Sequence, residues 1–208
     1  MSGKPDAAPG TDAAKEDRIR AETPIPIGVD AMFEFIADVE RLFRLNPHLE
    51  IDIWQRKADG MRLAARNETT GQRVETAVNV EMVREKRAIV LRYAAGLKQA
   101  TTLAVEDGDG NGCRFVVTEH YPVIDDELDP RVAEVDRSLI PWVSAIRRHV
   151  LGRKRWGWLP GWLWWNEHFL PGMTPRQRRI VRMIVWISVL EFAAFLLVAA
   201  VFWAEQRQ

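Results

Sequence analysis

Residues 23–49 read TPIPIGVDAMFEFIADVERLFRLNPHL, and within them the chain is expected to pass from extended backbone into helix. A strand is predicted from Arg18 to Ile25. An amphipathic helix should begin at about Asp30, a good N-cap residue. Its apolar positions recur at helical spacing and share one face: Met32, Phe33, Ile36 and Val39. The segment therefore predicts a strand followed by a helix with one apolar face.

A second, short helix is predicted from Glu40 to Leu45. It should end before Asn46-Pro47, because the residue that precedes a proline is driven out of the helical region. The apolar period then changes to two, and six further strands are predicted at 48–56, 61–66, 74–82, 89–93, 99–106 and 114–121. Glycines mark the turns between them, so the strands should form an antiparallel meander.

A long helix is predicted after the last strand. Asp129 would be its N-cap and Pro130 its first residue. Its apolar stripe comprises Val132, Val135, Leu139, Val143, Ile146 and Val150. Pro141 lies inside this helix and is expected to kink it.

The predicted order is one strand, two short helices, six strands and a long helix. With the 23–49 segment, including Asp38-Val39-Glu40-Arg41, this order resembles the START-like SRPBCC superfamily. The resemblance covers about residues 18–152. It implies an α+β helix-grip fold, in which a curved antiparallel sheet wraps the long C-terminal helix.

Two groups within the superfamily are the most similar. The Asp38-Val39-Glu40-Arg41 run looks like coenzyme Q-binding proteins. A START-like domain followed by a C-terminal hydrophobic helix is similar to an accessory protein of carbon monoxide dehydrogenase. These resemblances imply an apolar ligand or a docking role at a membrane.

An apolar cavity is expected between the 30–45 helices, the sheet and the 130–152 helix. Small inward residues at Ala65, Ala77, Ala94 and Ala104 would leave the space open. The candidate lining residues are Phe33, Ile36, His120, Tyr121, Leu139 and Val143. His120 or Glu119 could serve as an acid or base in a cyclase-like relative, although a solvated or satisfied polar pair is the plainer interpretation.

Catalytic and cofactor motifs are not evident in the sequence. It contains no P-loop, dinucleotide fingerprint or zinc-protease motif, and its four histidines are widely separated. The single cysteine, Cys113, cannot form an internal disulfide. We therefore predict no catalytic residue, no metal and no cofactor.

The charges are balanced overall but unevenly distributed. Lys plus Arg and Asp plus Glu both number 29, which argues against nucleic-acid binding. Residues 1–129 carry 17 basic and 24 acidic side chains, whereas residues 130–208 carry 12 and 5. The C-terminal part also holds eight of the nine tryptophans, so its chemistry differs from that of the rest of the chain.

A membrane span is predicted from Met183 to Trp203. These 21 residues are apolar apart from Ser188 and Glu191, and as a helix they would extend roughly 31 Å, about one hydrocarbon core. Twelve Leu, Ile, Val or Phe contribute about −4 to −7 kcal/mol of insertion free energy, against about +3 kcal/mol for the carboxylate. Four arginines precede the span and one follows it, which predicts a single-pass protein of the bacterial inner membrane with a cytoplasmic soluble domain.

The segment before the span is basic and rich in tryptophan, and it predicts one or two interfacial helices lying on membrane lipids. Its residues are Arg153, Lys154, Arg155, Trp156, Trp158, Trp162, Trp164 and Trp165. The tryptophans could instead pack against the soluble domain or a partner protein. Glu191, near the middle of the span, is expected to face a helix of a second copy or of another membrane protein.

The predicted organisation has five parts. They are a disordered tail (1–17), the START-like domain (18–152), the interfacial segment (153–182), the transmembrane helix (183–203) and a short non-cytoplasmic tail (204–208). We expect a membrane-tethered protein that binds a lipid, quinone or similar apolar ligand. The alternatives are an accessory subunit that anchors a membrane complex, and a cyclase or hydratase.

Overall fold

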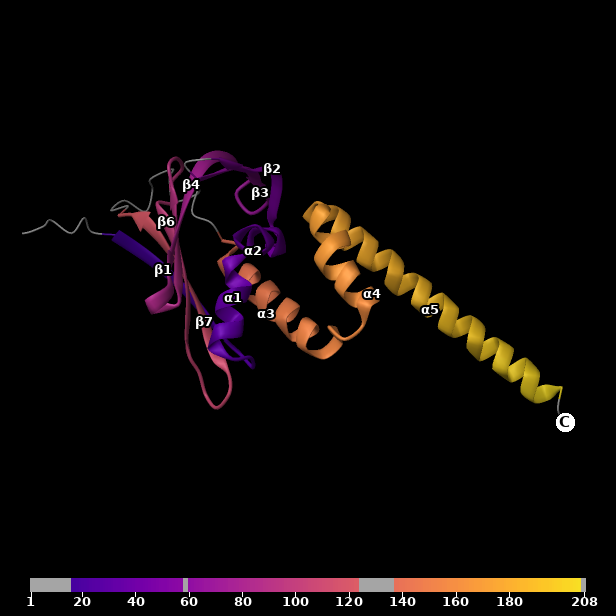
Figure 1. Ribbon diagram of the computed structural model, residues 1–208. Coiled ribbons are helices and arrows are strands. Elements are labelled where there is room, and N and C mark those ends of the chain that lie inside the picture. The colour runs from indigo at the N-terminus through magenta and orange to yellow at the C-terminus, as the bar shows by residue number, and fades with distance from the viewer. Residues whose placement is uncertain (1–15, 58–59, 124–136, 207–208) are drawn as a thin grey trace, which may run out of the picture.

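The computed structural model describes residues 16–57, 60–123 and 137–206. Seven antiparallel strands form one sheet in the order β1-β7-β6-β5-β4-β3-β2 (Figure 1). The strands are β1 (Glu16–Ile25), β2 (Leu49–Lys57), β3 (Gly60–Asn67), β4 (Arg73–Val83), β5 (Ala88–Tyr93), β6 (Ala100–Asp107) and β7 (Cys113–Pro122). All seven predicted strands are present.

Two short helices connect the edge strands of the sheet. Helix α1 (Val29–Ala37) and helix α2 (Val39–Leu45) lead the chain from β1, at one edge, to β2, at the other. Asp38 separates them and caps α2, since its side chain accepts a hydrogen bond from Arg41 N at 3.1 Å. The first apolar face was predicted only in part, because Met32, Ile36 and Val39 are buried whereas Phe33 packs at the margin of the core.

Helix α3 (Leu139–Trp156) lies on the same side of the sheet as α1 and α2 (Figure 1). Leu139, Val143, Ile146 and Val150 are buried against the sheet, as the apolar stripe predicts. The predicted start at Asp129-Pro130 lies outside the described residues, and the described helix begins at Leu139, after the non-helical Arg137 and Ser138. Pro141 is thus the third helical residue, where the missing N–H breaks no helical hydrogen bond, and the predicted kink is wrong.

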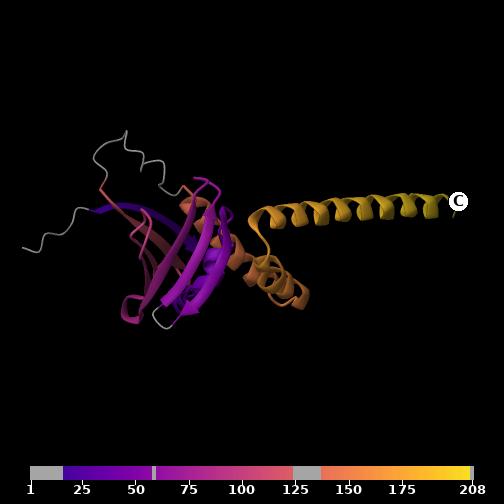
Figure 2. The same ribbon diagram turned by 90° about the horizontal axis from the view of Figure 1, so that it is seen from above.

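Shorter elements connect the domain to the last helix. They are η1 (Arg84–Lys86) between two strands, then α4 (Pro160–Leu163), the π-helical η3 (Trp164–Phe169) and the 3-10 turn η4 (Leu170–Gly172). Helix α5 (Pro175–Glu205) follows, opened by a capping box between Thr174 and Gln177. Figure 2 shows α5 projecting away from the domain, and its apolar side chains are exposed.

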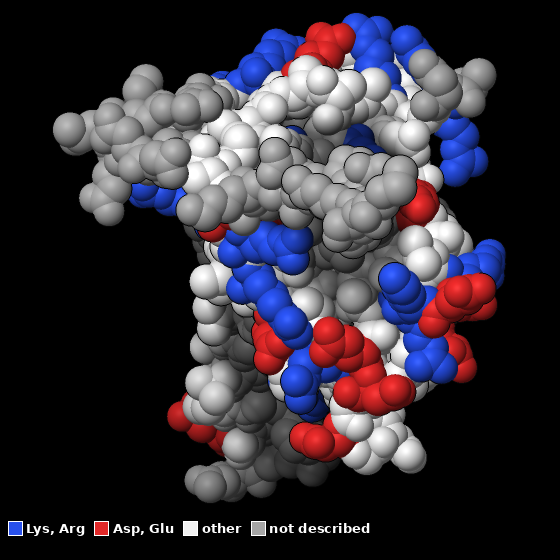
Figure 3. All heavy atoms as spheres, turned by 90° about the vertical axis from the view of Figure 1, so that its left-hand side faces the viewer, with Lys and Arg blue, Asp and Glu red and all other residues white. Residues whose placement is uncertain are grey.

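The outer face of the sheet is charged. Arg20 pairs with Glu22 at 3.0 Å and lies 3.4 Å from Glu106, and across the sheet Arg92 pairs with Glu81 at 3.8 Å. Acidic and basic side chains are interleaved on the face seen in Figure 3. The opposite face carries the apolar core and the helices, so any ligand space within the domain must lie on that side.

Candidate functional site

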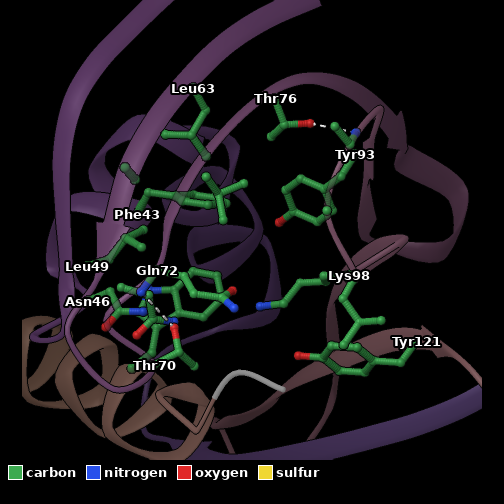
Figure 4. Close-up of a pocket in the computed structure, with 17 residues that line it drawn as sticks. Phe43, Asn46, Leu49, Leu63, Thr70, Gln72, Thr76, Tyr93, Lys98 and Tyr121 are labelled. Carbon is green, nitrogen blue, oxygen red and sulfur yellow. Dashed lines mark hydrogen bonds between the residues drawn. The ribbon is translucent and has the colours of Figure 1, made fainter. Parts of the chain in front are cut away.

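A cavity of about 140 Å³ lies between the sheet and helices α2 and α3 (Figure 4). Its position agrees with the cavity predicted from the sequence. One wall is apolar, formed by Phe43, Leu49, Leu63, Val74 and Trp142. Side chains and backbone of the α2–β2, β3–β4 and β5–β6 connections complete its lining.

Trp142 fixes the apolar wall where α3 meets α2. Its indole Nε1 donates a hydrogen bond of 2.7 Å to Leu42 O. Its ring meets Phe43 edge-on, with centroids 5.4 Å apart. Beside it the buried Asn46 donates from Nδ2 to Ser138 Oγ at 2.9 Å. These contacts join residues about a hundred positions apart in the chain, so this wall exists only when α3 is docked.

Glu119 organises the opposite, polar end of the cavity. Its side chain is fully buried on the inner face of β7. Lys98 Nζ binds Glu119 Oε1, and the Tyr121 hydroxyl donates to Glu119 Oε2 at 2.8 Å. A buried carboxylate is tolerated only when it is paired and hydrogen-bonded, so Glu119 holds these two polar groups in place.

The polar groups converge on one space. In Figure 4, Tyr93, Lys98 and Tyr121 direct their polar ends into the cavity. The Tyr93 hydroxyl is fixed by Thr101 Oγ1 at 3.1 Å, and Thr101 is itself fully buried. Thus an ammonium and two phenols face an apolar wall, an arrangement suited to a ligand with an apolar body and an oxygen-bearing end.

The volume of the cavity limits what can enter it. An apolar cavity of about 150 Å³ accommodates a benzene molecule. Ligand pockets for drug-sized molecules are larger, about 300–1,000 Å³. This cavity therefore has room for about one six-membered ring, and a long acyl chain would have to remain outside it.

The predicted lining residues lie in different places. Tyr121 lines the cavity. Ile36, Leu139 and Val143 are buried in the apolar core, and Phe33 packs at its margin. Their role in ligand binding stays a prediction.

His120 lies on the opposite face of β7 from Glu119 and Tyr121. Its Nε2 is 3.2 Å from Thr102 Oγ1, on the outer side of the sheet. The alternation along β7 therefore directs Glu119, not His120, towards the cavity. Among the small residues, Ala65 lines the cavity, whereas Ala77 and Ala94 are exposed.

Sequence reasoning missed Lys98 and Trp142. Lys98 lies in the connection between β5 and β6, where a lysine is usually a solvated surface residue. Trp142 follows Pro141 in the first turn of α3 and was overlooked as a cavity residue. No pattern in the sequence pairs Lys98 with Glu119, 21 positions away, because that contact follows from the packing of the β5–β6 connection against β7.

The predicted interfacial residues form two groups. Arg153, Lys154, Arg155 and Trp156 belong to the last turn of α3, and Trp158 and Trp164 have 75% and 57% of their surface exposed. Trp162 instead packs against the domain: it lies 6.0 Å from the His149 ring, next to Gly152 of α3. A Cβ at Gly152 would meet the Trp162 ring at 2.7 Å, so only glycine permits this contact. Trp165 stacks on Phe169 with centroids 4.8 Å apart.

Helix α5 has the length and apolar composition needed to cross a membrane. It begins at Pro175, so the arginines before Met183 belong to the same helix as the apolar residues. Glu191 lies within this exposed apolar stretch.

No protein-family model and no curated protein matches this sequence. Solved structures do match its fold. The Zhui aromatase/cyclase from Streptomyces sp. R1128 is 14% identical with a TM-score of 0.54, and the match covers 68% of this chain and 97% of that one. A norcoclaurine synthase point mutant from Thalictrum flavum is 14% identical with a TM-score of 0.53, covering 69% and 99%.

At this level of identity the similarity shows the fold alone. The sheet order, the two short helices after β1 and the long helix on the inner face agree with that fold. The matched structures belong to the START and Bet v1-like proteins, and they include enzymes. The chain therefore has the helix-grip α+β fold of the START-like proteins.

Proposed function

We propose that this protein binds an apolar, oxygen-bearing ligand at a membrane, on the cytoplasmic face. The observation that carries the proposal is the cavity, in which the ammonium of Lys98 and the phenols of Tyr93 and Tyr121 face an apolar wall. The START-like fold supports a ligand-binding role. Of the lipid or quinone ligands expected from the sequence, the volume favours a single ring such as a quinone headgroup, with its chain outside.

Lys98 is the group that would select such a ligand. An ammonium carries three N–H donors, so it can hold Glu119 and also meet a carbonyl oxygen of a ring. Glu119 fixes its position in advance, which reduces the entropy lost on binding. The exposed apolar helix α5 supports the membrane tether, since it would keep the cavity close to the membrane in which such ligands dissolve.

Native mass spectrometry of the full-length protein in detergent tests this proposal. A short-chain quinone should add to the wild-type protein and be displaced by filling the cavity through Leu63→Trp. Lys98→Met should weaken binding about tenfold, the effect of one charge-assisted hydrogen bond. The matched control is Lys57→Met, on an exposed position of β2. Equal binding by the Leu63→Trp variant and by the wild type would exclude this cavity as the site.

A second candidate function is catalysis of the cyclase type. It is favoured by one observation, the contact of three titratable groups, Lys98, Glu119 and Tyr121, at the cavity. Such a cluster can transfer protons to a bound substrate. Proteins of similar fold include an aromatase/cyclase and a norcoclaurine synthase. Chemical conversion of a bound ring compound, lost in Glu119→Gln, would distinguish catalysis from binding alone.

Glu191 supports a third proposal, in which the protein is an accessory subunit that anchors a membrane complex. A carboxylate inside the bilayer is costly unless it has a partner, so we propose that Glu191 faces a helix of a second copy or of another membrane protein. Glu191→Leu should abolish crosslinking between the helices in native membranes. Ser188→Leu, one turn away, serves as the control. Unchanged crosslinking in Glu191→Leu at equal expression would exclude the contact.

A further inference from the structure

Four arginines gather where α5 meets the soluble domain. Arg44 comes from α2, and Arg178, Arg179 and Arg182 come from the first two turns of α5. We call these four residues the arginine cluster. Arg178 Nη1 donates to Arg44 O, and Arg44 Nη1 donates to Pro171 O at 3.4 Å, so the α2 arginine and the start of α5 are in direct contact.

A small cleft opens beside the cluster. It has a volume of about 50 Å³ and lies between Arg44, Arg178 and the turn from Pro171 to Pro175 that precedes α5. A site for one water molecule needs about 10–15 Å³ on the same measure, so a larger polar group such as a phosphate can enter. The cleft is adjacent to the N-terminal end of a 31-residue helix, where the helix dipole favours an anion.

The cluster has more positive charge than its contacts balance. Two carboxylates contact it within the described part of the chain: Glu40, 2.8 Å from Arg44, and Glu68, 2.8 Å from Arg179. Four arginines and two carboxylates leave a formal excess of two positive charges. Glu68 is further shared with His48, whose Nδ1 lies 4.0 Å away.

Arg178 shows the consequence of this imbalance. Burial lowers the pKa of Arg178 to about 10, and the charges of Arg182 and Arg44 act in the same direction, against Glu68. Its Nε is buried without a hydrogen-bond partner among the described residues. A guanidinium that is partly desolvated beside like charges is stabilised when an anion binds it.

The position of the cluster along α5 indicates which anion is available. At 1.5 Å per residue, Arg182 and Arg178 lie about 1.5 Å and 7.5 Å before Met183, the first residue of the apolar run. The headgroup layer on one side of a bilayer is about 5–8 Å thick. The cluster therefore falls at the depth of lipid phosphates if α5 crosses the membrane.

We propose that the arginine cluster binds the phosphate of an anionic phospholipid headgroup. The inference rests on the proposed insertion of α5, but it concerns a site separate from the ligand cavity. Guanidinium groups bind phosphate oxygens through paired, charge-assisted hydrogen bonds. The bound headgroup would fill the cleft, balance the charge excess and fix the domain relative to α5.

The test compares two lipids with the same acyl chains on the full-length protein in detergent. Phosphatidylglycerol and phosphatidylcholine are titrated and their adducts are counted by native mass spectrometry. We expect phosphatidylglycerol to bind about tenfold more tightly, because its net charge complements the excess of the cluster. No preference between the two lipids would overturn the proposal and would leave an acidic protein surface as the alternative occupant.

Matched variants locate the site. Arg178→Gln and Arg182→Gln should each weaken phosphatidylglycerol binding at least about fivefold. Arg176→Gln carries the same change of charge on an exposed position of the same helix and should leave binding unchanged. Arg182→Gln does not disturb the hydrogen bond from Arg178 to Arg44, so it keeps the test valid if Arg178→Gln unfolds. Equal losses in Arg176→Gln and Arg182→Gln would indicate general surface charge and overturn the site.

Two further arms separate the sources and the proposals. Inorganic phosphate at millimolar concentration should not displace the lipid, and displacement would assign the cluster to free phosphate instead. Lys98→Met should leave headgroup binding unchanged, so failure of the cavity proposal is seen separately. Release of the protein by alkaline carbonate would refute the membrane tether, whereas loss of lipid preference in detergent refutes only the headgroup site.

Discussion

Glu119 combines complete burial with a negative charge, and its two partners determine what this arrangement costs. Lys98 and Tyr121 satisfy both carboxylate oxygens, and both partners also line the cavity. The ion pair is therefore part of the wall of the site. Stability and ligand recognition depend on the same three side chains, so a change at one of them affects both.

We expect Glu119→Leu to lower the free energy of unfolding by about 2–4 kcal/mol, because it leaves the Lys98 ammonium without its carboxylate in a largely buried position. Lys98→Met combined with Glu119→Leu should recover part of this loss. Urea denaturation measures both. Glu75→Leu, which breaks the exposed pair with Arg62 on the outer face, should cost less than about 1 kcal/mol. A similar cost at the two sites would contradict the buried role of Glu119.

His149 makes the stability of the domain depend on pH. It is buried between Phe35 and Trp162, 5.7 Å and 6.0 Å between ring centroids. Burial lowers the pKa of His149 from 6.5 to about 4, with the charges of Arg41, Arg153 and Arg182 acting in the same direction. Between pH 6.5 and 4 the unfolded chain holds a proton on this imidazole that the folded chain lacks. The free energy of unfolding must therefore fall as the pH falls through this window.

The expected loss attributable to His149 is about 2–3 kcal/mol between pH 7 and pH 4.5. His149→Phe should remove this part of the pH dependence, because a phenyl ring can occupy the same aromatic environment without binding a proton. His168→Phe, at an exposed position, is the control. Urea denaturation at both pH values gives the comparison. An unaltered pH dependence in His149→Phe would show that this imidazole titrates normally.

At the scale of elements, the α3–α4 turn is the part of the domain that projects along α5 (Figures 1 and 2). It carries Trp156 and Trp158, with Arg155 lying 5.0 Å from the Trp156 ring. Exposed indoles and arginines suit the headgroup layer. If α5 crosses a bilayer, this turn would give the domain a second contact with the membrane.

An environment-sensitive fluorophore tests this contact. Trp158→Cys, labelled and reconstituted at full length into liposomes, should emit at shorter wavelength than the same label at Ile140→Cys. Ile140 is 72% exposed, nearly the same as Trp158, but lies at the opposite end of α3. Cys113 is buried and should remain unlabelled. Water-like emission from both positions would mean that the turn does not touch lipid.

The elements of the domain could be predicted from the sequence because their signals are local. Period-two alternation and turn glycines located the seven strands; at Gly60, for instance, a Cβ would lie 2.7 Å from Val78 O. The start of α3 could not be located, because Asp129-Pro130 is an equally plausible cap to any residue before Leu139. The inward face of β7 was ambiguous, since Val116 is buried on the outer face as Phe115 is on the inner one. The pairing of Lys98 with Glu119 depends on tertiary packing alone.

For the whole molecule, the distribution of charge predicts an orientation. Arg176, Arg178, Arg179 and Arg182 precede the apolar run, while Arg207 follows it beside Glu205. Positive side chains are retained on the cytoplasmic side. Protease added to inside-out inner-membrane vesicles should therefore digest the domain, and protease added to intact spheroplasts should not. Digestion in spheroplasts would reverse the proposed topology.

The pairing of β1 with β7 has a kinetic consequence. Glu16 lies opposite Pro122, so the first strand of the sheet finds its partner only in the last one. Such distant pairing raises the contact order and slows folding to milliseconds or longer, because a long loop must close before the contact contributes. During synthesis β1 emerges first and waits with an unpaired edge for about a hundred residues. This interval is when the chain is most exposed to aggregation, and a chaperone that binds β1 would protect it then.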